Sequence, residues 1–395
     1  MTILTTWTLT TIAVLLAAVS VVFTIEVIAS LFFRRCRTIV KDERRVRVAV
    51  LVPAHDEAIG IAGTLDNIKA QLEPGDRLMV VADNCSDDTA DIAAARGAEV
   101  SVRFDTTRIG KGYALDWGLR QLEKNPPDIV IVVDADCRLA PLAIDRLAST
   151  CEQTKRPVQA LYLMTAPAGS RINHQVAEFA WRVKNMARPL GLSALGFPCQ
   201  LMGTGMAFPW AIIRSVDLGS GQIVEDLKLG LDLARTGCSP SFCPEALVTS
   251  SFPNSEQGAK IQRQRWEHGQ IGLICTTAIP LLREAIITRN FGLLVLVFDL
   301  LVPPLSLFVL ALTASVLASA VLAFFGQRPL SFIVAISSLT VFGLSATLAW
   351  IAYGRSALPL KSVALIPCYL SSKIGQYASA IAKGRTSQWV RTDRG

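Results

Sequence analysis

A long apolar run near the N-terminus limits most strongly what this chain can fold into. Residues 9–33 contain one charged side chain, Glu26, in about 25 residues. A helix of that length can cross the hydrocarbon core of a bilayer. A cleaved signal peptide is the alternative, but the run is long, no basic residue precedes it and no small-residue cleavage site follows it. We therefore predict an uncleaved transmembrane helix over 1–33.

A second apolar region predicts two more transmembrane helices. It occupies 291–353, with spans at roughly 296–325 and 330–353. Pro303 and Pro304 either kink the first span or mark where it starts, because proline removes a backbone donor.

The last part of the chain, 354–395, is expected to be an interfacial segment followed by a tail. Prolines and lysines interrupt its apolar stretch at 357–382, so this stretch is expected to lie in the membrane interface rather than cross the bilayer.

Basic residues set the predicted orientation. They crowd 34–47, 260–289 and 373–394, whereas the one loop expected outside carries only Arg328. By the positive-inside rule, the N-terminus is outside, and 34–290 and the C-terminal tail are cytosolic. We expect a bacterial inner (plasma) membrane protein with its catalytic domain in the cytosol.

Net charge and cysteine content narrow the class of protein further. The net charge of +7 is mostly membrane-flanking, and no basic patch with interleaved aromatic residues favours a nucleic-acid partner. Nine cysteines without a C-x-x-C pair fit reduced thiols in a cytosolic compartment. Three histidines argue against a His-based zinc site.

The cytosolic segment alternates strand and helix, which predicts an α/β fold with a mostly parallel sheet covered on both faces. The predicted strands are 46–52, 77–82, 99–103 and 129–133, and the predicted helices are 57–71, 89–95 and 111–123. In such a sheet, binding groups belong at the carboxyl ends of the strands.

Polar clusters follow these strands. Asp134 and Asp136 come directly after an apolar strand, and both carboxylates can reach one Mg²⁺ or Mn²⁺ ion, which prefer oxygen ligands. A turn with Asp residues at its corners is the alternative. Asp83 ends another strand, where it can accept a hydrogen bond from a ligand. Lys111 lies either near phosphate groups or in solvent.

Two carboxylates, Glu225 and Asp226, open an amphipathic helix. They either favour the helix dipole or include a general base that takes a proton from an acceptor hydroxyl. Upstream, Gly203 and Thr204 belong to a Gly-Thr-Gly turn that would let a ligand approach the backbone. The turn lacks the spacing of a phosphate-binding P-loop.

The run Gln262-Arg263-Gln264-Arg265-Trp266 joins an amide, a guanidinium and an indole. On a helix, Gln262, Arg265 and Trp266 can face one cleft, because residues three and four apart are neighbours. An indole can stack on a sugar ring, and a guanidinium can hold a leaving pyrophosphate. Ordinary helix packing is the alternative.

Six segments in this order resemble the family 2 glycosyltransferases, and in particular their membrane-bound branch of cellulose, chitin-oligosaccharide, hyaluronan and poly-N-acetylglucosamine synthases. The segments are Pro-Ala-His-Asp-Glu (53–57), Ala-Asp-Asn-Cys-Ser-Asp-Asp-Thr (82–89), Gly-Lys-Gly (110–112), Asp-Ala-Asp (134–136), Glu-Asp (225–226) and Gln-Arg-Gln-Arg-Trp (262–266). The resemblance covers roughly 46–290, and 388–394 resembles a tail motif of that branch.

The resemblance implies a GT-A nucleotide-sugar-binding domain over 34–290, with flanking transmembrane helices and interfacial helices at the C-terminal end of the domain. It also implies an inverting transfer from a nucleotide-diphosphate sugar, by default UDP-linked glucose or N-acetylglucosamine. Asp56 or Glu57, together with Asp83, would hold the nucleobase and ribose. Asp134 would face the donor sugar and diphosphate, and Asp136 would bind Mg²⁺ or Mn²⁺.

The remaining roles follow from the same resemblance. Asp226 would be the base, and Gln262 and Arg265 would hold the pyrophosphate, near Lys111. Trp266 would stack under the acceptor sugar. The acceptor would also be bound by Gly203, Thr204 and Glu225.

Three departures from the family pattern keep the product open. Val224 stands where many members have Thr, and the Met-Gly-Thr-Gly-Met turn at 202–206 differs from the versions in cellulose and hyaluronan synthases. Only three spans are predicted, so a long product would need a channel shared in a homo-oligomer, or an export partner.

Three functions therefore remain at this point. The first is extension of a β-linked polysaccharide at the inner face of the membrane. The second is addition of a single sugar to a lipid-linked acceptor in exopolysaccharide or glycolipid assembly. The third is a nucleotide-sugar-binding module that has lost catalysis, although the residues expected for catalysis are present.

Overall fold

The computed structural model describes residues 2–33, 46–167, 169–219, 224–253, 255–326 and 330–383. The basic cluster directly after the first span, Arg328 and the tail motif at 388–394 lie outside the described residues.

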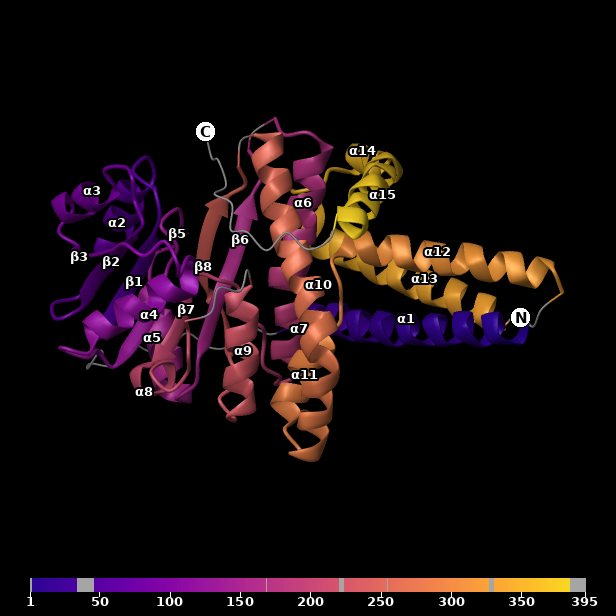
Figure 1. Cartoon of the computed structure of the whole chain (residues 1–395), viewed down its shortest axis with the longest axis horizontal. Helices are drawn as coiled ribbons and strands as arrows, with labels where there is room; N and C mark the ends of the chain where they lie inside the picture. The colour runs from indigo at the N-terminus through magenta and orange to yellow at the C-terminus, as the bar shows by residue number, and fades with distance from the viewer. Residues whose placement is uncertain are drawn as a thin grey trace.

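An eight-stranded sheet forms the centre of the protein, in the order β3-β2-β1-β4-β7-β6-β8-β5 (Figure 1). The strands are β1 (Val48–Ala54), β2 (Arg77–Asp83), β3 (Glu99–Arg103), β4 (Ile129–Val132), β5 (Arg138–Leu139), β6 (Val158–Thr165), β7 (Met206–Pro209) and β8 (Ser241–Ser251). The four strands predicted from the sequence are β1 to β4, and they are all parallel to one another.

The other half of the sheet is mixed. β7 runs antiparallel to both β4 and β6, whereas β6 and β8 are parallel. The reason lies in the turn before β7, where Gly203 and Gly205 have φ of +90° and +64°. Glycine adopts these positive φ values most easily, and the turn reverses the direction of the chain beside the carboxyl end of β4. Met206 then pairs with Val132, beside the predicted acidic cluster.

Both faces of the sheet are buried, as predicted. Val48, Val50 and Val52 of β1 pack into one hydrophobic core, with α2 (Ile61–Lys69) and α5 (Ala143–Thr154). The alternate residues Ala49 and Leu51 pack into a second core on the other face, with α4 (Lys111–Leu122) and part of α9 (Glu225–Arg235). Successive side chains of a strand point to opposite faces, so an all-apolar strand has to be covered on both sides.

Helices cover the sheet, and several long apolar ones project away from it (Figure 1). They are α1 (Thr2–Leu31), α2 (Ile61–Lys69), α3 (Thr89–Ala95), α4 (Lys111–Leu122), α5 (Ala143–Thr154), α6 (Ile172–Arg182), the π-helix η1 (Val183–Ala187), α7 (Arg188–Ala194), α8 (Trp210–Ile213), α9 (Glu225–Arg235), α10 (Glu256–Ile287), α11 (Phe291–Leu300), α12 (Leu305–Phe324), α13 (Leu330–Ala349), the π-helix η2 (Trp350–Gly354), α14 (Leu360–Val363) and α15 (Ile366–Lys383).

Four of these segments are long and apolar enough to cross a membrane, one more than the sequence predicted. They are Leu4–Leu31, Gln257–Ile287, Leu305–Phe324 and Leu330–Gly354. α1, α12 and α13 pack together and project away from the sheet, whereas α10, the additional segment, runs across their ends (Figure 1). The interfacial position expected for α10 stays a prediction.

The predicted start of the second span, at 296, is wrong. α11 ends at Leu300 and α12 begins at Leu305, with Pro303 and Pro304 between them. The proline pair therefore marks the start of the span and does not kink it, because proline cannot donate the hydrogen bond that a continuous helix needs. α15, within the segment predicted to be interfacial, is not among the four long apolar segments.

The long apolar helix α1 also packs directly against α7, beside the sheet. The two helices approach closely at Gly191, where a Cβ atom would lie 1.8 Å from the carbonyl oxygen of Glu26. Only a residue without a side chain permits this approach, so α1 and α7 are held together backbone to backbone.

We expect Gly191→Ala to destabilise the protein by about 1–3 kcal/mol, the usual cost of overpacking, because α7 must move away from α1. Gly343→Ala in α13 is the matched control, since a Cβ there meets no atom within 4 Å. Thermal unfolding in detergent measures both variants. A Gly191→Ala variant that melts with the wild type would contradict the contact.

Candidate functional site

A cavity of about 940 Å³ lies at the carboxyl ends of the parallel strands and extends to α7, α10 and α11. It brings together residues that the sequence analysis placed in separate segments. The predicted site residues that line it are Asp56, Glu57, Asp83, Lys111, Asp134, Asp136, Gly203, Glu225, Asp226, Gln262, Arg265 and Trp266.

One end of the cavity is built by the loops after β1 and β2. The Asp56 carboxylate accepts a hydrogen bond from the Ser86 backbone N–H at 2.6 Å. Burial raises the pKa of Asp56, but the hydrogen bonds from Ser86 outweigh it and the net pKa is lowered. Arg103 pairs with Asp83 at 2.5 Å, yet burial still raises the pKa of Asp83. Both carboxylates are thus held in place at the sheet edge.

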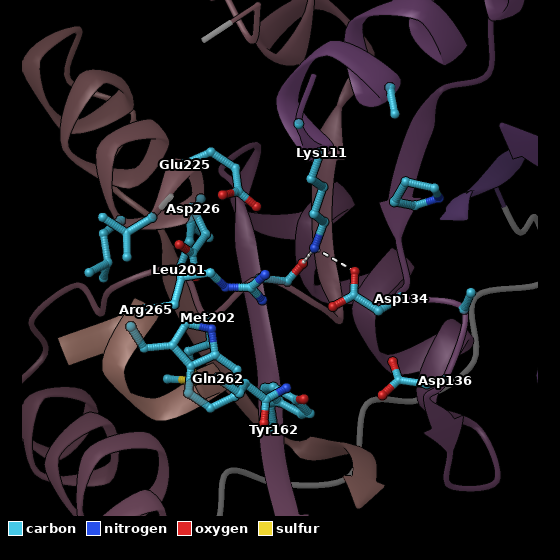
Figure 2. A pocket seen from close by; sticks show the side chains of 18 of the residues that line it. Lys111, Asp134, Asp136, Tyr162, Leu201, Met202, Glu225, Asp226, Gln262 and Arg265 are labelled. Carbon is cyan, nitrogen blue, oxygen red and sulfur yellow. Dashed lines mark hydrogen bonds and ion pairs between the residues drawn. The ribbon is translucent and has the colours of Figure 1, made fainter. Parts of the chain in front are cut away.

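Lys111 connects the two sides of the cavity. Its Nζ lies 2.5 Å from Asp134 Oδ1 and donates to the Gly203 carbonyl oxygen at 2.6 Å (Figure 2). Burial lowers the pKa of Lys111, but the charges of Asp134 and Glu225 more than offset it, so the pKa is raised and the ammonium stays charged. The solvated alternative for Lys111 is therefore wrong.

Thr204 does not line the cavity, so its predicted contact with the acceptor is wrong. Its side chain is fully buried, and its hydroxyl accepts a hydrogen bond from the Asp134 backbone N–H at 3.0 Å. The reason is the return of the chain into β7, which turns this residue toward β4. Through this hydrogen bond, Thr204 holds the loop that carries Asp134 and Asp136.

Asp134 and Asp136 form the candidate metal site. Their carboxylate oxygens and the Cys137 Sγ lie within 4.8 Å of one another. Burial raises the pKa of the Cys137 thiol strongly. Sulfur is also a softer ligand than Mg²⁺ or Mn²⁺ prefer, so we assign no ligand role to Cys137. The remaining donors are carboxylate oxygens, which suit Mg²⁺ or Mn²⁺.

Glu225 and Asp226 begin α9 and reach the cavity from the side opposite Asp134 (Figure 2). Burial raises the pKa of Glu225 to about 7, and the neighbouring Asp226 adds to this. Burial also raises the pKa of Asp226, against the opposing charges of Lys184 and Lys111. A Cβ atom at Gly203 would lie 3.4 Å from Asp226 Oδ2, so the glycine leaves space in front of this carboxylate.

The prediction that Gln262, Arg265 and Trp266 face one cleft is confirmed, because all three lie on α10 and line this cavity. Gln262 is buried, and its Oε1 has no hydrogen-bond partner within the described part of the chain. The Trp266 ring packs on Trp181 of α6, with centroids 4.8 Å apart and planes tilted by 38°. Two indoles therefore form one aromatic wall.

Sequence reasoning missed the residues that α6, η1 and α7 contribute. Trp181, Lys184 and Arg188 all line the cavity. Their spacing of three and four residues was a signal that one helix face could carry them. They follow no strand end, however, and a π-helical turn between them changes the helix register. Asp299 of α11 was missed because its segment looked like a membrane span.

Known proteins resemble the chain over this same region. Residues 45–269 match the profile of the family described as glycosyltransferase like family 2. A probable glycosyltransferase, YdaM, of Bacillus subtilis (strain 168) is 26% identical over 245 residues, covering 56% of this chain and 55% of that protein. The chain thus spans about half the length of this curated relative.

Two solved structures are similar to the chain. The mannosyltransferase PcManGT from Pyrobaculum calidifontis, in complex with GDP-Man and Mn²⁺, matches with a TM-score of 0.54 at 18% identity, covering 87% of this chain and 98% of that one. A glucosyl-3-phosphoglycerate synthase from Mycobacterium tuberculosis, in complex with Mn²⁺, UDP-Glc and phosphoglyceric acid, has a TM-score of 0.38 at 25% identity over 56% of this chain and 78% of that one. The predicted α/β fold of the GT-A type is thereby confirmed, on the match to PcManGT.

We expect Glu225→Gln to raise the melting temperature more at pH 8 than at pH 5. With a pKa of about 7 in the folded protein and 4.5 ordinarily, Glu225 binds more protons when folded, so its contribution to stability is lost as pH rises through this range. Melting temperatures of both proteins at the two pH values measure the effect.

Glu99→Gln is a control of opposite sign. Hydrogen bonding by Arg77 lowers the pKa of Glu99, so its carboxylate stabilises the fold above the ordinary pKa, and this variant should melt lower than the wild type at both pH values. A Glu225→Gln variant with the same temperature shift at pH 5 and pH 8 would show that this carboxyl titrates normally.

Proposed function

Because the chain belongs to the glycosyltransferase like family 2, we propose that it transfers a sugar from a nucleotide-diphosphate sugar to a glycan acceptor at the membrane, with inversion of the anomeric centre. The observation that carries this proposal is a single cavity with a half-buried carboxylate, Asp226, opposite an acidic pair, Asp134 and Asp136. A module without catalysis would have no need of this arrangement.

Asp226 is the proposed base. An inverting transfer is one displacement, so it needs one group to take the proton of the acceptor hydroxyl and one stabilised leaving group. The space in front of Asp226 at Gly203 suits the approach of a hydroxyl. Lys184 and Lys111 oppose the effect of burial, so they favour the ionised form that can accept a proton.

The leaving diphosphate is assigned to the opposite side of the cavity. A bound Mg²⁺ or Mn²⁺ would neutralise the charge that develops on it, and Asp134 and Asp136 would hold this ion. PcManGT, the similar structure, contains Mn²⁺. Lys111 and Arg265 add fixed positive charge near the diphosphate. The Gln262 Oε1, which has no hydrogen-bond partner among the described residues, can accept a hydrogen bond from a sugar hydroxyl.

The nucleobase and ribose are assigned to the end with Asp56, Glu57 and Asp83. Carboxylates held by Ser86 and Arg103 are suited to accept hydrogen bonds from a base and from ribose hydroxyls. The nucleotide is UDP by the sequence resemblance, while PcManGT was solved with a GDP-sugar. Both belong in the experimental screen.

Addition of one or a few sugars is favoured over extrusion of a long polymer. Within the described residues, none of the side chains that line the cavity belongs to α1, α12 or α13, so these membrane helices offer no lined path for a chain. Polymer extension would then need a homo-oligomer or an export partner. The basic residues at 260–289 support a cytosolic position for the site.

We expect Asp226→Asn to lower kcat by about 10²–10⁴-fold, because the amide keeps the shape of the side chain but cannot take the proton. Glu225→Gln is the matched control and should lose far less. Initial rates of sugar transfer measure both. In the wild type, kcat/KM should fall on acidification at a pH above the ordinary Asp value, since burial raises the pKa of Asp226. Full activity in Asp226→Asn would exclude this base.

A screen of UDP- and GDP-linked sugars for release of the nucleoside diphosphate tests the activity itself. We expect EDTA to stop turnover and added Mn²⁺ or Mg²⁺ to restore it, and turnover that EDTA leaves unchanged would overturn the role of Asp134 and Asp136. Sizing of the radiolabelled product then separates the two modes of transfer: one added sugar supports single addition, and a ladder supports polymer extension.

A further inference from the structure

Glu26 is the one charged residue of membrane helix α1, and it is buried at 2% exposure. An ionisable side chain within a membrane-spanning helix is costly, so such residues have partners and often mark a functional site. Its partner lies in the catalytic domain. Glu26 Oε2 accepts a hydrogen bond from Arg188 Nε at 2.6 Å.

Arg188 is held from a second side by α11. Its Nη2 donates to the Asp299 carboxylate and to the Asp299 carbonyl oxygen, both at 2.6 Å. All three side chains are at least nine-tenths buried. One guanidinium thus connects α1, α7 and α11.

Stability alone is a weak reason for this arrangement. Desolvation of a buried ion pair offsets most of its Coulomb attraction, and apolar residues of similar volume often serve as well or better. The ion triad of Glu26, Arg188 and Asp299 does supply a guanidinium with a fixed position and orientation. Two carboxylates on different helices determine where its plane lies.

The fixed guanidinium faces the cavity. Arg188 and Asp299 line it together with Asp226, on the α7 and α11 side of the proposed base. Hydrogen bonds account for Nε and Nη2 of Arg188, and Nη1 has no hydrogen-bond partner among the described residues. An oriented N–H donor is therefore available at the end of the cavity opposite the nucleotide.

We propose that Arg188 binds the acceptor sugar through Nη1, and that Glu26 is the positioning residue that holds Arg188 for this contact. The inference rests on the proposed transferase function. It makes membrane helix α1 part of the acceptor site, although α1 itself does not line the cavity. The aromatic wall of Trp181 and Trp266 would supply the stacking surface for the same sugar.

The charges at this end point to an uncharged sugar. Glu26 and Asp299 both pair with Arg188, and Lys184 lies on the same cavity as the carboxylates Glu225 and Asp226. A phosphate on the acceptor at this position would therefore meet a guanidinium whose charge is already paired with two carboxylates. A sugar hydroxyl can instead accept a hydrogen bond from Arg188 and give its proton to the base.

The test compares Glu26→Gln with the wild type in the full-length protein in detergent. The donor is the nucleotide sugar found by the screen, and the acceptor probes are methyl β-D-glucoside and glucose 1-phosphate. We expect the KM for methyl β-D-glucoside to rise about tenfold, as loss of a hydrogen bond between charged groups would produce. Donor hydrolysis without acceptor should change much less. The wild type should prefer the neutral probe.

Ser20→Ala is the matched control, because Ser20 is also a buried polar residue of α1 but bonds only within its own helix. It should leave both reactions unchanged. An unchanged KM in Glu26→Gln would overturn the proposal, and so would a wild-type preference for glucose 1-phosphate. Equal loss of transfer and of donor hydrolysis would mean a general loss of structure. In that case the acceptor KM of a Glu26→Asp variant is compared with that of Glu26→Gln. The positioning role requires a KM between those of Glu26→Gln and the wild type, and a KM as high as that of Glu26→Gln refutes it.

Failure of the proposed function would look different. A wild-type protein that releases no nucleoside diphosphate from any nucleotide sugar would contradict the transferase assignment itself. The comparison of acceptor KM with donor hydrolysis addresses only the role of Glu26 and Arg188.

Discussion

The position of β4 determines where the chemistry can occur. β4 is parallel to β1 on one side and antiparallel to β7 on the other, so its carboxyl end meets the turn from which β7 starts. The acidic loop after β4 is therefore fixed against the Gly203–Gly205 turn, by the Thr204 hydroxyl and by Lys111. Other residues that line the cavity, from α7, α9, α10 and α11, lie around this junction.

Local sequence patterns were sufficient for the parallel half of the fold. The helix 89–95 and the strand 99–103 agree with the structure to the residue, and the acidic clusters lie at strand ends as predicted. These signals are local, because an apolar strand, a following polar loop and a parallel register together bring carboxylates to one edge. The shared face of Gln262, Arg265 and Trp266 was predictable for the same reason, as helix spacing alone decides it.

What the sequence did not reveal depends on contacts between distant segments. Thr204 was expected to meet the acceptor, but the direction of β7 turns it toward Asp134. Arg188 and Asp299 are 111 residues apart and have no motif in common. Glu26 was visible as a lone charge in an apolar run, yet nothing local indicates that its partner lies in the catalytic domain.

The close approach of α1 to Gly191 has a practical consequence for work with this protein. Membrane enzymes are often shortened to their water-soluble domain so that they are easier to purify. A fragment that begins after α1 would leave a groove along α7 and an arginine without one of its two carboxylates. If Arg188 contacts the acceptor as proposed, acceptor specificity measured on such a fragment would describe an altered site, so substrate discovery should use the chain with α1 intact.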